Sequence, residues 1–375
     1  DARTGEHLWK FNVIPQPGEV GHDTWENDAW EWSGNINTWP PLSADPELGI
    51  VYVTTDAPTN DYFGGHRPGD NLFGNSVVAI DVRTGERVWH FQAIHHDVWD
   101  RDFPHPPQLM DVTVDGEQIP ALVQTSKQAF VYAFNRATGE PIWPIEERAV
   151  PASTVPGEQA SPTQPFPTRP APFDRQGVSG DDLLDFTPEL NAEARRIASE
   201  YQLGPLFTPP ILAGANGLRG LLMLPQMTGG ANWQGGAVDA ETGVLYVASV
   251  TNPTVAGLTN DQNRSTMNYI GGGARRRSRG AAAPQGCGEI GPLGLPLIKP
   301  PWGRITAIDL NSGDHLWMVP NGDTPDCVKN HPALSGLDIP RTGKHERSGI
   351  LVTRTLLFAG EGGGLFATPT WAGGP

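Results

Sequence analysis

The chain repeats one short phrase, which reads Asp81-Val-Arg-Thr-Gly-Glu-Arg-Val-Trp89 in its second copy. The other copies begin at Asp1, Asn135 and Asp309, and the last has Ser-Gly-Asp where the others have Thr-Gly-Glu. A glycine between small polar and acidic residues is typical of a tight turn, and the tryptophan that follows belongs to a β-strand. Because one strand–turn–strand unit recurs along the chain, the sequence predicts an array of similar β-modules.

A second phrase alternates with the first and adds two strands to each module. It occurs as Asp45-Pro-Glu-Leu-Gly-Ile-Val-Tyr-Val53 and as Asp239-Ala-Glu-Thr-Gly-Val-Leu-Tyr-Val247. Each copy has a turn at glycine and then a run of β-branched and aromatic residues that favours a strand. The two phrases together predict an all-β fold, a β-propeller of four-stranded antiparallel blades. The tryptophan after each Thr-Gly-Glu turn is expected to pack between neighbouring sheets.

An insertion interrupts the repeat between about residues 144 and 225. Residues 151–173 are rich in proline and threonine and are expected to form an extended loop. A short helix is predicted over 187–201, with Thr187 as its N-cap and Pro188 in the first helical position. A long insertion of this kind usually covers one face of a domain, often above a site.

The segments after the insertion are assigned from composition and strand propensity. Residues 255–301 are rich in glycine and proline and are expected to form a loop, in which the basic run Arg275–Arg279 is exposed. The last strands are expected at 349–353 and 355–359, where β-branched and large apolar residues follow one another.

The composition indicates a globular β-protein and argues against nucleic acid as a partner. The 375 residues include 45 Gly and 37 Pro, but 12 Trp and 13 Phe supply large side chains for a core, which favours turn-rich β-structure over disorder. The net charge is −16, whereas nucleic-acid binding needs a basic surface.

The cysteines and the start of the chain lead to further expectations. Cys287 and Cys327 lie 40 residues apart without a Cys-x-x-Cys motif, so zinc is disfavoured, and they form either one disulfide or two separate thiols. No run of 18 apolar residues predicts a membrane-spanning helix. Because the chain begins at Asp1 inside a copy of the phrase, we interpret it as a piece of a longer protein, and expect membrane association only through other parts.

The densest group of polar residues follows the second copy of the repeated phrase, at the end of a predicted strand. It contains two histidines and three aspartates within eight residues: His95, His96, Asp97, Asp100 and Asp102. Carboxylates suit a hard cation such as Ca²⁺, and a carboxylate within reach of a substrate hydroxyl can act as a base. The alternative is structural, with the aspartates of a turn accepting hydrogen bonds from backbone N–H groups.

Two further residues have both a structural and a functional interpretation. Lys127 lies in a segment that leads into a predicted strand, where a lysine is usually a solvated charge at an edge. Trp39, within Asn37-Thr-Trp-Pro-Pro41, is either a core residue or a flat surface on which a ring stacks. Neither residue alone decides between the two interpretations.

The order of these residues resembles that of the pyrroloquinoline quinone (PQQ)-dependent dehydrogenases. The most specific part is His-His-Asp-x-Trp-Asp, with a lysine 27 residues after its last aspartate. The likeness is closest to the sugar and polyol branch, typified by membrane-bound glucose dehydrogenase, and is weakest in 144–225 and after residue 320. It rests on residues spread along the chain: Trp39, Thr59, Asp100, Lys127, Asn232-Trp233 and Leu295–Gly303.

The resemblance implies an eight-bladed propeller with PQQ at its axis, of which residues 1–375 form a partial domain of about five blades. It implies that Asp100 is the catalytic base and lies near a metal ion, and that Lys127 contacts the ortho-quinone of PQQ. Trp39 is expected to stack under the PQQ ring and Thr59 to contact PQQ. Lysine at position 127 favours the sugar and polyol branch, because the alcohol branch tends to have arginine there.

Some positions depart from the family pattern. The alcohol branch often has an asparagine metal ligand where this chain has Thr55-Asp56-Ala57, so Asp56 is a candidate ligand. The asparagine that meets PQQ aligns loosely, with Asn252 preferred to Asn232. Asp102 stands where lanthanide-using relatives add a ligand, but members of the sugar branch also have aspartate there, so Ca²⁺ or Mg²⁺ is preferred to a lanthanide.

The activity that the resemblance implies is PQQ-dependent oxidation of a sugar, polyol or related alcohol on the periplasmic side of the membrane. Hydride passes to PQQ while Asp100 removes the hydroxyl proton and Lys127 polarises the quinone, and electrons continue to ubiquinone or a cytochrome c. The rival hypothesis is a non-catalytic propeller that acts as a scaffold or interaction domain. Such a scaffold has no need for Asp100, Lys127 and Trp39 together.

Overall fold

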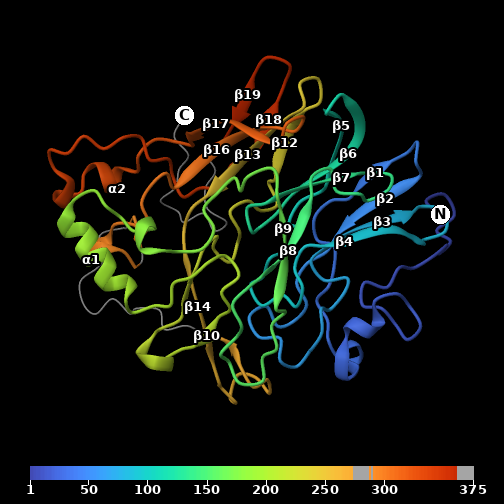
Figure 1. Cartoon of the computed structure of the whole chain (residues 1–375), viewed down its shortest axis with the longest axis horizontal. Coiled ribbons are helices and arrows are strands. Elements are labelled where there is room, and N and C mark those ends of the chain that lie inside the picture. The colour runs from blue at the N-terminus through green and yellow to red at the C-terminus, as the bar shows by residue number, and fades with distance from the viewer. Residues whose placement is uncertain (273–286, 289, 361–375) are drawn as a thin grey trace.

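Antiparallel β-sheets are the main regular structure of the chain, and long loops connect them (Figure 1). The computed structural model describes residues 1–272, 287–288 and 290–360, so the basic run Arg275–Arg279 lies outside the described residues. Among the residues that are described, no helix is long and apolar enough to cross a membrane. The prediction of an all-β fold is confirmed.

Two sheets contain the four antiparallel strands that the alternating phrases predict. The first consists of β1 (Ser43–Asp45), β2 (Ile50–Thr54), β3 (Ser76–Asp81) and β4 (Arg87–Gln92). The second consists of β12 (Gly236–Asp239), β13 (Val244–Val250), β16 (Gly303–Asp309) and β17 (Asp314–Pro320). In both sheets the second phrase supplies the turn between the first two strands, and the repeated Thr-Gly-Glu or Ser-Gly-Asp turn joins the last two. Each sheet therefore has the form of a propeller blade.

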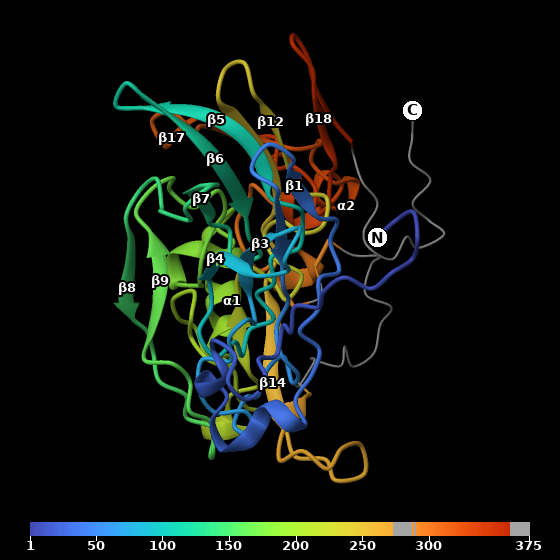
Figure 2. The ribbon, with the colours of Figure 1, turned by 90° about the vertical axis from the view of Figure 1, so that its right-hand side faces the viewer.

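A third sheet stands between these two (Figure 2). It contains three strands: β5 (Gln108–Val114), β6 (Glu117–Thr125) and β7 (Val131–Asn135). After β7 the third copy of the phrase adds a bridge between Phe134 and Pro141 in place of a longer fourth strand. β5 contacts β1 on one side and β12 on the other, so the first strands of the three sheets follow one another in space.

A hairpin continues this series at the C-terminal end of the described chain. β18 (Ile350–Val352) pairs with β19 (Leu357–Ala359), and β18 contacts β12. Both strands lie within the ranges predicted from the sequence. Together with the turn of residues 1–9, the three sheets and this hairpin give parts of five successive modules.

The tryptophans of the repeated phrase pack on the glycine turns of the next module, as predicted. A Cβ atom placed on Gly85 would lie 2.6 Å from the ring of Trp9, and one placed on Gly139 would lie 2.6 Å from the ring of Trp89. Glycine is therefore required in these turns both for its positive φ and for the space taken by the indole.

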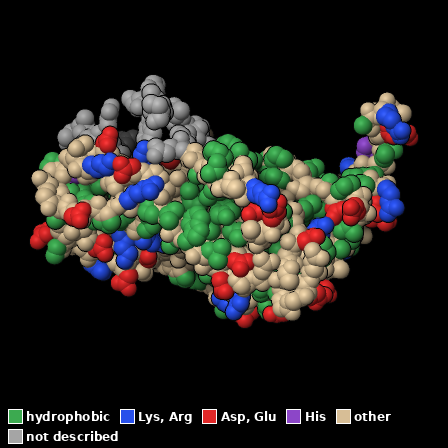
Figure 3. Space-filling view, turned by 90° about the horizontal axis from the view of Figure 1, so that it is seen from above, with side chains coloured by type: hydrophobic (Ala, Val, Ile, Leu, Met, Phe, Trp, Pro, Cys, Tyr) green, Lys and Arg blue, Asp and Glu red, His purple; other side chains and the backbone are tan. Residues whose placement is uncertain are grey.

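The outer strand β17 carries the last copy of this tryptophan. Trp317 is 40% exposed, and Leu316, Met318 and Val319 on the same strand are also exposed. Viewed from above, hydrophobic side chains gather in the middle of the molecule (Figure 3). Within the described part of the chain, no glycine turn covers Trp317 as Gly85 covers Trp9.

The insertion contains more regular structure than its composition predicts. The helix α1 spans Pro188–Ala198, and the hydroxyl of its N-cap Thr187 accepts a hydrogen bond from the Leu190 amide at 3.2 Å, as predicted. β8 (Ile145–Ala149) pairs with β9 (Thr163–Pro167), although a loop was predicted over the second of these segments. The pairing partner lies about 20 residues away, beyond the reach of local patterns.

A mixed sheet also replaces part of the loop expected over 255–301. It is formed by β10 (Ile211–Leu212), β14 (Thr254–Thr259), β11 (Leu221–Met223) and β15 (Ile270–Gly271). β14 pairs with β10 and β11, both from the insertion, so the insertion is tied to the blades by backbone hydrogen bonds. This strand was missed because its partners are distant in the sequence.

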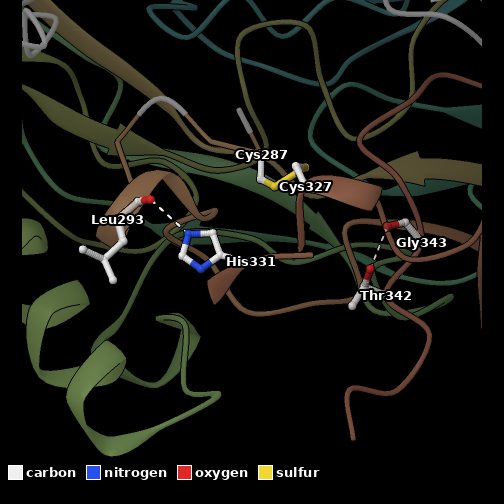
Figure 4. Close-up of a disulfide and its surroundings, with 6 residues drawn as sticks. All are labelled: Cys287, Leu293, Cys327, His331, Thr342 and Gly343. Carbon is white, nitrogen blue, oxygen red and sulfur yellow. Dashed lines mark hydrogen bonds between the residues drawn. A yellow bond between two sulfur atoms is a disulfide. The ribbon is translucent and has the colours of Figure 1, made fainter. Parts of the chain in front are cut away.

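The remaining helical elements are short, and one of them carries a disulfide. Cys327 lies in α2 (Asp326–Lys329) and is bonded to Cys287, which decides between the two alternatives left open by the sequence (Figure 4). α2 lies near α1 at the end of the molecule opposite the N-terminus (Figure 1). The described 3₁₀ helices are His22–Thr24, Glu26–Glu31, Gly180–Asp182, Ala215–Gly217, Pro292–Gly294 and Pro332–Leu334.

Candidate active site

The candidate residues lie on loops that leave β2, β4 and β6. Asp56 follows β2, residues 93–104 follow β4, and Lys127 follows β6. Alternate strands of an antiparallel sheet run in the same direction, so β2 and β4 deliver their loops to one edge. The loop of residues 93–104 is fixed to the main core by its buried side chains, which are Ala93, Ile94, Val98, Trp99 and Phe103.

Lys127 joins two of the predicted aspartates. Its Nζ atom lies 2.7 Å from Oδ1 of Asp100 and 2.6 Å from Oδ2 of Asp102. The other oxygen of Asp102 accepts a hydrogen bond from the Ala57 amide at 3.0 Å, which connects this group to the loop after β2. Lys127 and Asp102 are nearly buried, whereas the side chain of Asp100 keeps 21% of its exposure, so a small molecule can reach it.

The acidic groups outnumber the cations of this site, and the pKa values of three aspartates are raised. Burial raises the pKa of Asp100 well above its ordinary value, although the positive charge of Lys127 acts in the opposite direction. Burial and the charge of Asp102 raise the pKa of Asp56 to about 7. Burial also raises the pKa of Asp61, and the charges of Asp97 and Asp102 raise it further. An added cation would relieve this repulsion.

Lys127 remains protonated in this surrounding. Burial lowers the pKa of the ammonium group, but the charges and hydrogen bonds of Asp102 and Asp100 raise it by more. The two aspartates therefore hold a permanent positive charge between them. The alternative of a solvated edge lysine does not hold, since Lys127 is only 5% exposed.

Trp39 and Trp233 line one cavity of about 430 Å³. Trp39 is 42% exposed and Trp233 is 58% exposed, so neither is a core residue. The cavity is tied to the charged group on two sides. The Asn37 amide, two residues before Trp39, donates to Asp56 at 2.6 Å. The Gly230 amide, three residues before Trp233, donates to the carbonyl of Lys127 at 2.9 Å.

The other predicted contacts occupy the surroundings of this group. Thr59 is exposed and its carbonyl accepts from Nε of Arg67 at 3.1 Å. Asn232 is buried, and its side chain donates to the Thr228 carbonyl at 2.6 Å in the segment that packs on Lys127. Asn252 follows β13 and is half-buried. The choice between the two asparagines stays a prediction.

The histidines of the loop have acidic partners from the insertion and do not converge on the aspartates. Nε2 of His95 lies 3.1 Å from Glu147, and Nε2 of His96 lies 2.7 Å from Glu158. His96 and Glu158 are almost fully buried. Within the described part of the chain, no group of three or more His, Cys, Asp or Glu side chains is arranged to hold a metal ion. The histidines therefore fasten the insertion to the loop.

Sequence reasoning missed the residues that support the site. The carboxylate of Asp97 accepts hydrogen bonds from the backbone of its own loop, so the structural alternative describes this aspartate. Arg67 is fully buried and donates to the carbonyls of Thr59, Asn60 and Asp97, which links the loop after β2 to the loop after β4. Asp97 stands in the His-His-Asp-x-Trp-Asp motif, but its supporting role was not predicted, and Arg67 stands in no motif.

The curated proteins that are similar to this chain include dehydrogenases of glucose and glycerol. A glycerol dehydrogenase large subunit of Gluconobacter oxydans is 31% identical over 86% of this chain and 45% of its own length. A quinoprotein glucose dehydrogenase of Escherichia coli is 29% identical over 88% of this chain and 41% of its own length. The chain thus spans less than half the length of these relatives.

A solved structure supports the fold, and a family model identifies the family. The quinohemoprotein alcohol dehydrogenase of Comamonas testosteroni superposes with a TM-score of 0.51, at 21% identity, over 85% of this chain and 42% of that one, which supports the propeller fold. The family model described as the β-propeller domain of PQQ-dependent glucose, ethanol and alcohol dehydrogenases matches residues 1–366. The chain therefore belongs to the PQQ-dependent dehydrogenase β-propeller family.

Proposed function

We propose that the full-length protein oxidises a sugar, polyol or related alcohol with PQQ as its cofactor. The observation that carries this proposal is the pair of contacts from Lys127 to Asp100 and Asp102. A backbone hydrogen bond from Gly230 to Lys127 joins this group to the segment that carries Trp233, one of two exposed indoles that line a cavity. Relatives named as glucose, glycerol and quinate dehydrogenases indicate the class of substrate. The share of the relatives that this chain covers leaves the substrate itself open.

The residues around the cavity fit a flat, anionic quinone. Trp39 and Trp233 offer exposed aromatic faces, which bind a planar ring system well. Lys127 would offer a fixed positive charge to a quinone oxygen, and Thr59 and either Asn232 or Asn252 would offer polar groups, although none of these residues lines the cavity itself. When bound, PQQ supplies the two-electron chemistry that side chains lack.

In this proposal Asp100 takes the proton of the substrate hydroxyl. Burial raises the pKa of Asp100, and a raised pKa makes a carboxylate a better acceptor of a proton. Lys127 keeps its own proton and holds Asp100 in place, and its charge favours negative charge that develops on the quinone oxygens.

A divalent cation, Ca²⁺ or Mg²⁺, is proposed beside the same carboxylates, with a lanthanide less favoured. Asp100 and Asp102 are the proposed ligands, with Asp56 as a third, and oxygen donors of this kind suit hard cations. Asp102 already contacts Ala57 and Lys127, so the cation needs further ligands beyond those that the described residues bring together. The cation would balance the excess negative charge of the site.

The electron acceptor and the location follow from the same proposal. Ubiquinone or a cytochrome c is proposed to take the electrons, on the periplasmic side of the membrane. The disulfide between Cys287 and Cys327 fits an oxidising compartment, and the acidic net charge gives no reason to expect nucleic acid as a partner.

The test is reconstitution of the full-length protein with PQQ and Ca²⁺, followed by dye-linked oxidation of glucose, glycerol and quinate. Asp100→Asn is expected to lower kcat by about 10²–10⁴-fold, the usual contribution of a general base, and to leave PQQ binding unchanged in a spectroscopic titration. Asp111→Asn, at an exposed aspartate of β5, is the matched control and should keep full activity. Normal turnover by Asp100→Asn would remove this residue as the base. Failure to bind PQQ would favour the scaffold hypothesis.

A further inference from the structure

The backbone of Asp100 has a conformation that its side chain alone does not favour. Its φ is 59°, in the left-handed region, where residues with a Cβ are disfavoured by about 1–2 kcal/mol. Aspartate and asparagine enter this region more readily than most residues, but they still require local contacts to stay there. The neighbours of Asp100 should therefore contain the group that holds it.

That group is the carboxylate of Asp97. Its Oδ1 atom accepts a hydrogen bond from the Trp99 amide at 2.7 Å, and its Oδ2 atom accepts one from the Arg101 amide at 2.7 Å. These are the two N–H groups on either side of Asp100. One carboxylate therefore fixes the peptide unit that precedes Trp99 and the one that follows Asp100, and so brackets the residue whose side chain meets Lys127.

Two longer side chains fix the same segment from outside. The indole of Trp99 donates to the Thr208 carbonyl at 2.8 Å, and the guanidinium of Arg101 donates to the Gln226 carbonyl at 2.9 Å. Both side chains are fully buried. They anchor the ends of the segment, whereas the turn between them depends on Asp97.

The Asp97 carboxylate also accepts one hydrogen bond from outside its loop. The side-chain amide of Asn75, which precedes β3, donates to Oδ2 of Asp97 at 2.8 Å. Asp97 is 1% exposed, so it cannot touch a substrate or a cofactor in the cavity. Any effect that it has on the reaction must pass through Asp100.

We propose that Asp97 is a positioning residue, whose carboxylate holds the backbone around Asp100 so that the Asp100 side chain points at Lys127 and the substrate hydroxyl. This inference rests on the proposed function, because it assumes that Asp100 is the base. It assigns to the aspartate of His-Asp-x-Trp-Asp a task different from that of the aspartate that ends the motif.

The test is Asp97→Asn in the full-length protein loaded with PQQ and Ca²⁺. An amide has one acceptor oxygen, so only one of the Trp99 and Arg101 amides keeps its acceptor, while the other faces an NH₂ group. We expect kcat to fall about 10–100-fold with KM within threefold, because a small displacement of a catalytic group has effects of this size. The isotope effect with perdeuterated glycerol or glucose should rise, and PQQ affinity should stay unchanged.

A readout without substrate comes from amide hydrogen exchange in the absence of PQQ. The peptide that covers residues 98–102 should exchange faster in Asp97→Asn than in the wild type. Asn75→Ala is the matched control, because it removes a buried hydrogen bond to the same carboxylate but leaves both bonds that flank Asp100. It should keep kcat within threefold and leave exchange of this peptide unchanged.

A double variant, Asn75→Asp/Asp97→Asn, swaps the two side chains. It keeps the buried negative charge near Arg67 and restores the contact between positions 75 and 97. It still lacks the acceptor for one of the Trp99 and Arg101 amides, so its kcat should fall as that of Asp97→Asn does. It replaces that variant if the single change prevents folding.

A kcat of Asp97→Asn within twofold of the wild type, or an equal loss in Asn75→Ala, would overturn the inference. If Asp100→Asn retains turnover, the proposed function fails instead, and the exchange measurement still tests whether Asp97 holds the loop.

Discussion

The turns of the repeated phrase and the loop of residues 93–104 both contain residues with positive φ, but they are held by different means. In the turns this residue is glycine, with φ of 74° at Gly85 and 78° at Gly139. The contacts are local, since Asp81 accepts from the amides two and three residues ahead. In the loop, Asp100 adopts φ of 59°, and its segment is held by Asp97 and also by distant carbonyls, those of Thr208 and Gln226. The blades are thus specified by short stretches of sequence, and the site by the assembled fold.

In this comparison, the largest effect is expected for Lys127→Ala, which changes the site and leaves the blades intact. Without the ammonium group Asp100 and Asp102 lose their shared partner, and a buried carboxylate without a partner costs about 3 kcal/mol or more. The loss of a preorganised charge next to the reacting oxygen is expected to lower kcat by about 10²–10³-fold. Dye-linked turnover and urea unfolding of the full-length protein measure the two effects.

Lys329→Ala is the matched control for this change, because Lys329 pairs with Asp323 on the surface, where ion pairs contribute less than about 1 kcal/mol. It should change neither turnover nor stability beyond that amount. Wild-type rates in Lys127→Ala would show that the lysine has no part in the reaction.

The second prediction concerns a substitution that changes a blade and leaves the site intact. Gly139→Ala introduces a Cβ atom 2.6 Å from the ring of Trp89, in a turn with φ of 78°, and should lower the free energy of unfolding by about 2–4 kcal/mol. Gly5→Ala lies in the first copy of the same phrase, with φ of 74° and no atom within 4 Å of its Cβ. It carries the backbone strain alone and should lose about 1 kcal/mol.

The difference between these two variants measures the packing of tryptophan on the turn. Thermal unfolding and urea titration give the two free energies, and kcat of Gly139→Ala at low temperature should match the wild type. Equal losses in the two variants would mean that the indole contributes nothing to the turn.

The sequence predicted the blades because their signals are local. Thr-Gly-Glu turns and the runs of β-branched residues around them fix β3, β4, β16 and β17 within a few residues. The strands β9 and β14 were not predicted, because their partners come from other parts of the chain. Proline or glycine in these segments indicated a loop. Tertiary pairing outweighed local composition in both.

The site was predictable in part for the same reason. Asp100 and Asp102 follow β4 and Lys127 follows β6, and the structure brings both aspartates within hydrogen-bond distance of Lys127. The His96–Glu158 contact joins residues 62 positions apart, across an insertion with no repeat to guide the alignment. The role of Asp97 depends on its bonds to the Trp99 and Arg101 amides, which form only when the loop is folded.

The smallest expected effect is on the pH dependence of stability. It distinguishes the loop region from the blade turns, because the buried His105 lies next to the loop. Burial lowers the pKa of His105 to about 4, and the imidazole lies between the Pro106 carbonyl and the Thr125 hydroxyl. One ring nitrogen donates to the carbonyl and the other accepts from the hydroxyl, so protonation removes an acceptor. The unfolded pKa is about 6.5.

Because the folded pKa lies below the unfolded one, the contribution of His105 is present above pH 6.5 and is lost as the pH falls toward 4. The expected loss is about 1 kcal/mol between pH 7 and pH 5.5, which urea titrations at the two pH values measure. His105→Gln cannot titrate, so it should be less stable at pH 7 but show a pH dependence smaller by the same amount. An unchanged pH dependence in this variant would show that His105 is not the source. Gly139→Ala should keep the pH dependence of the wild type, because its defect lies in a blade turn without a buried histidine.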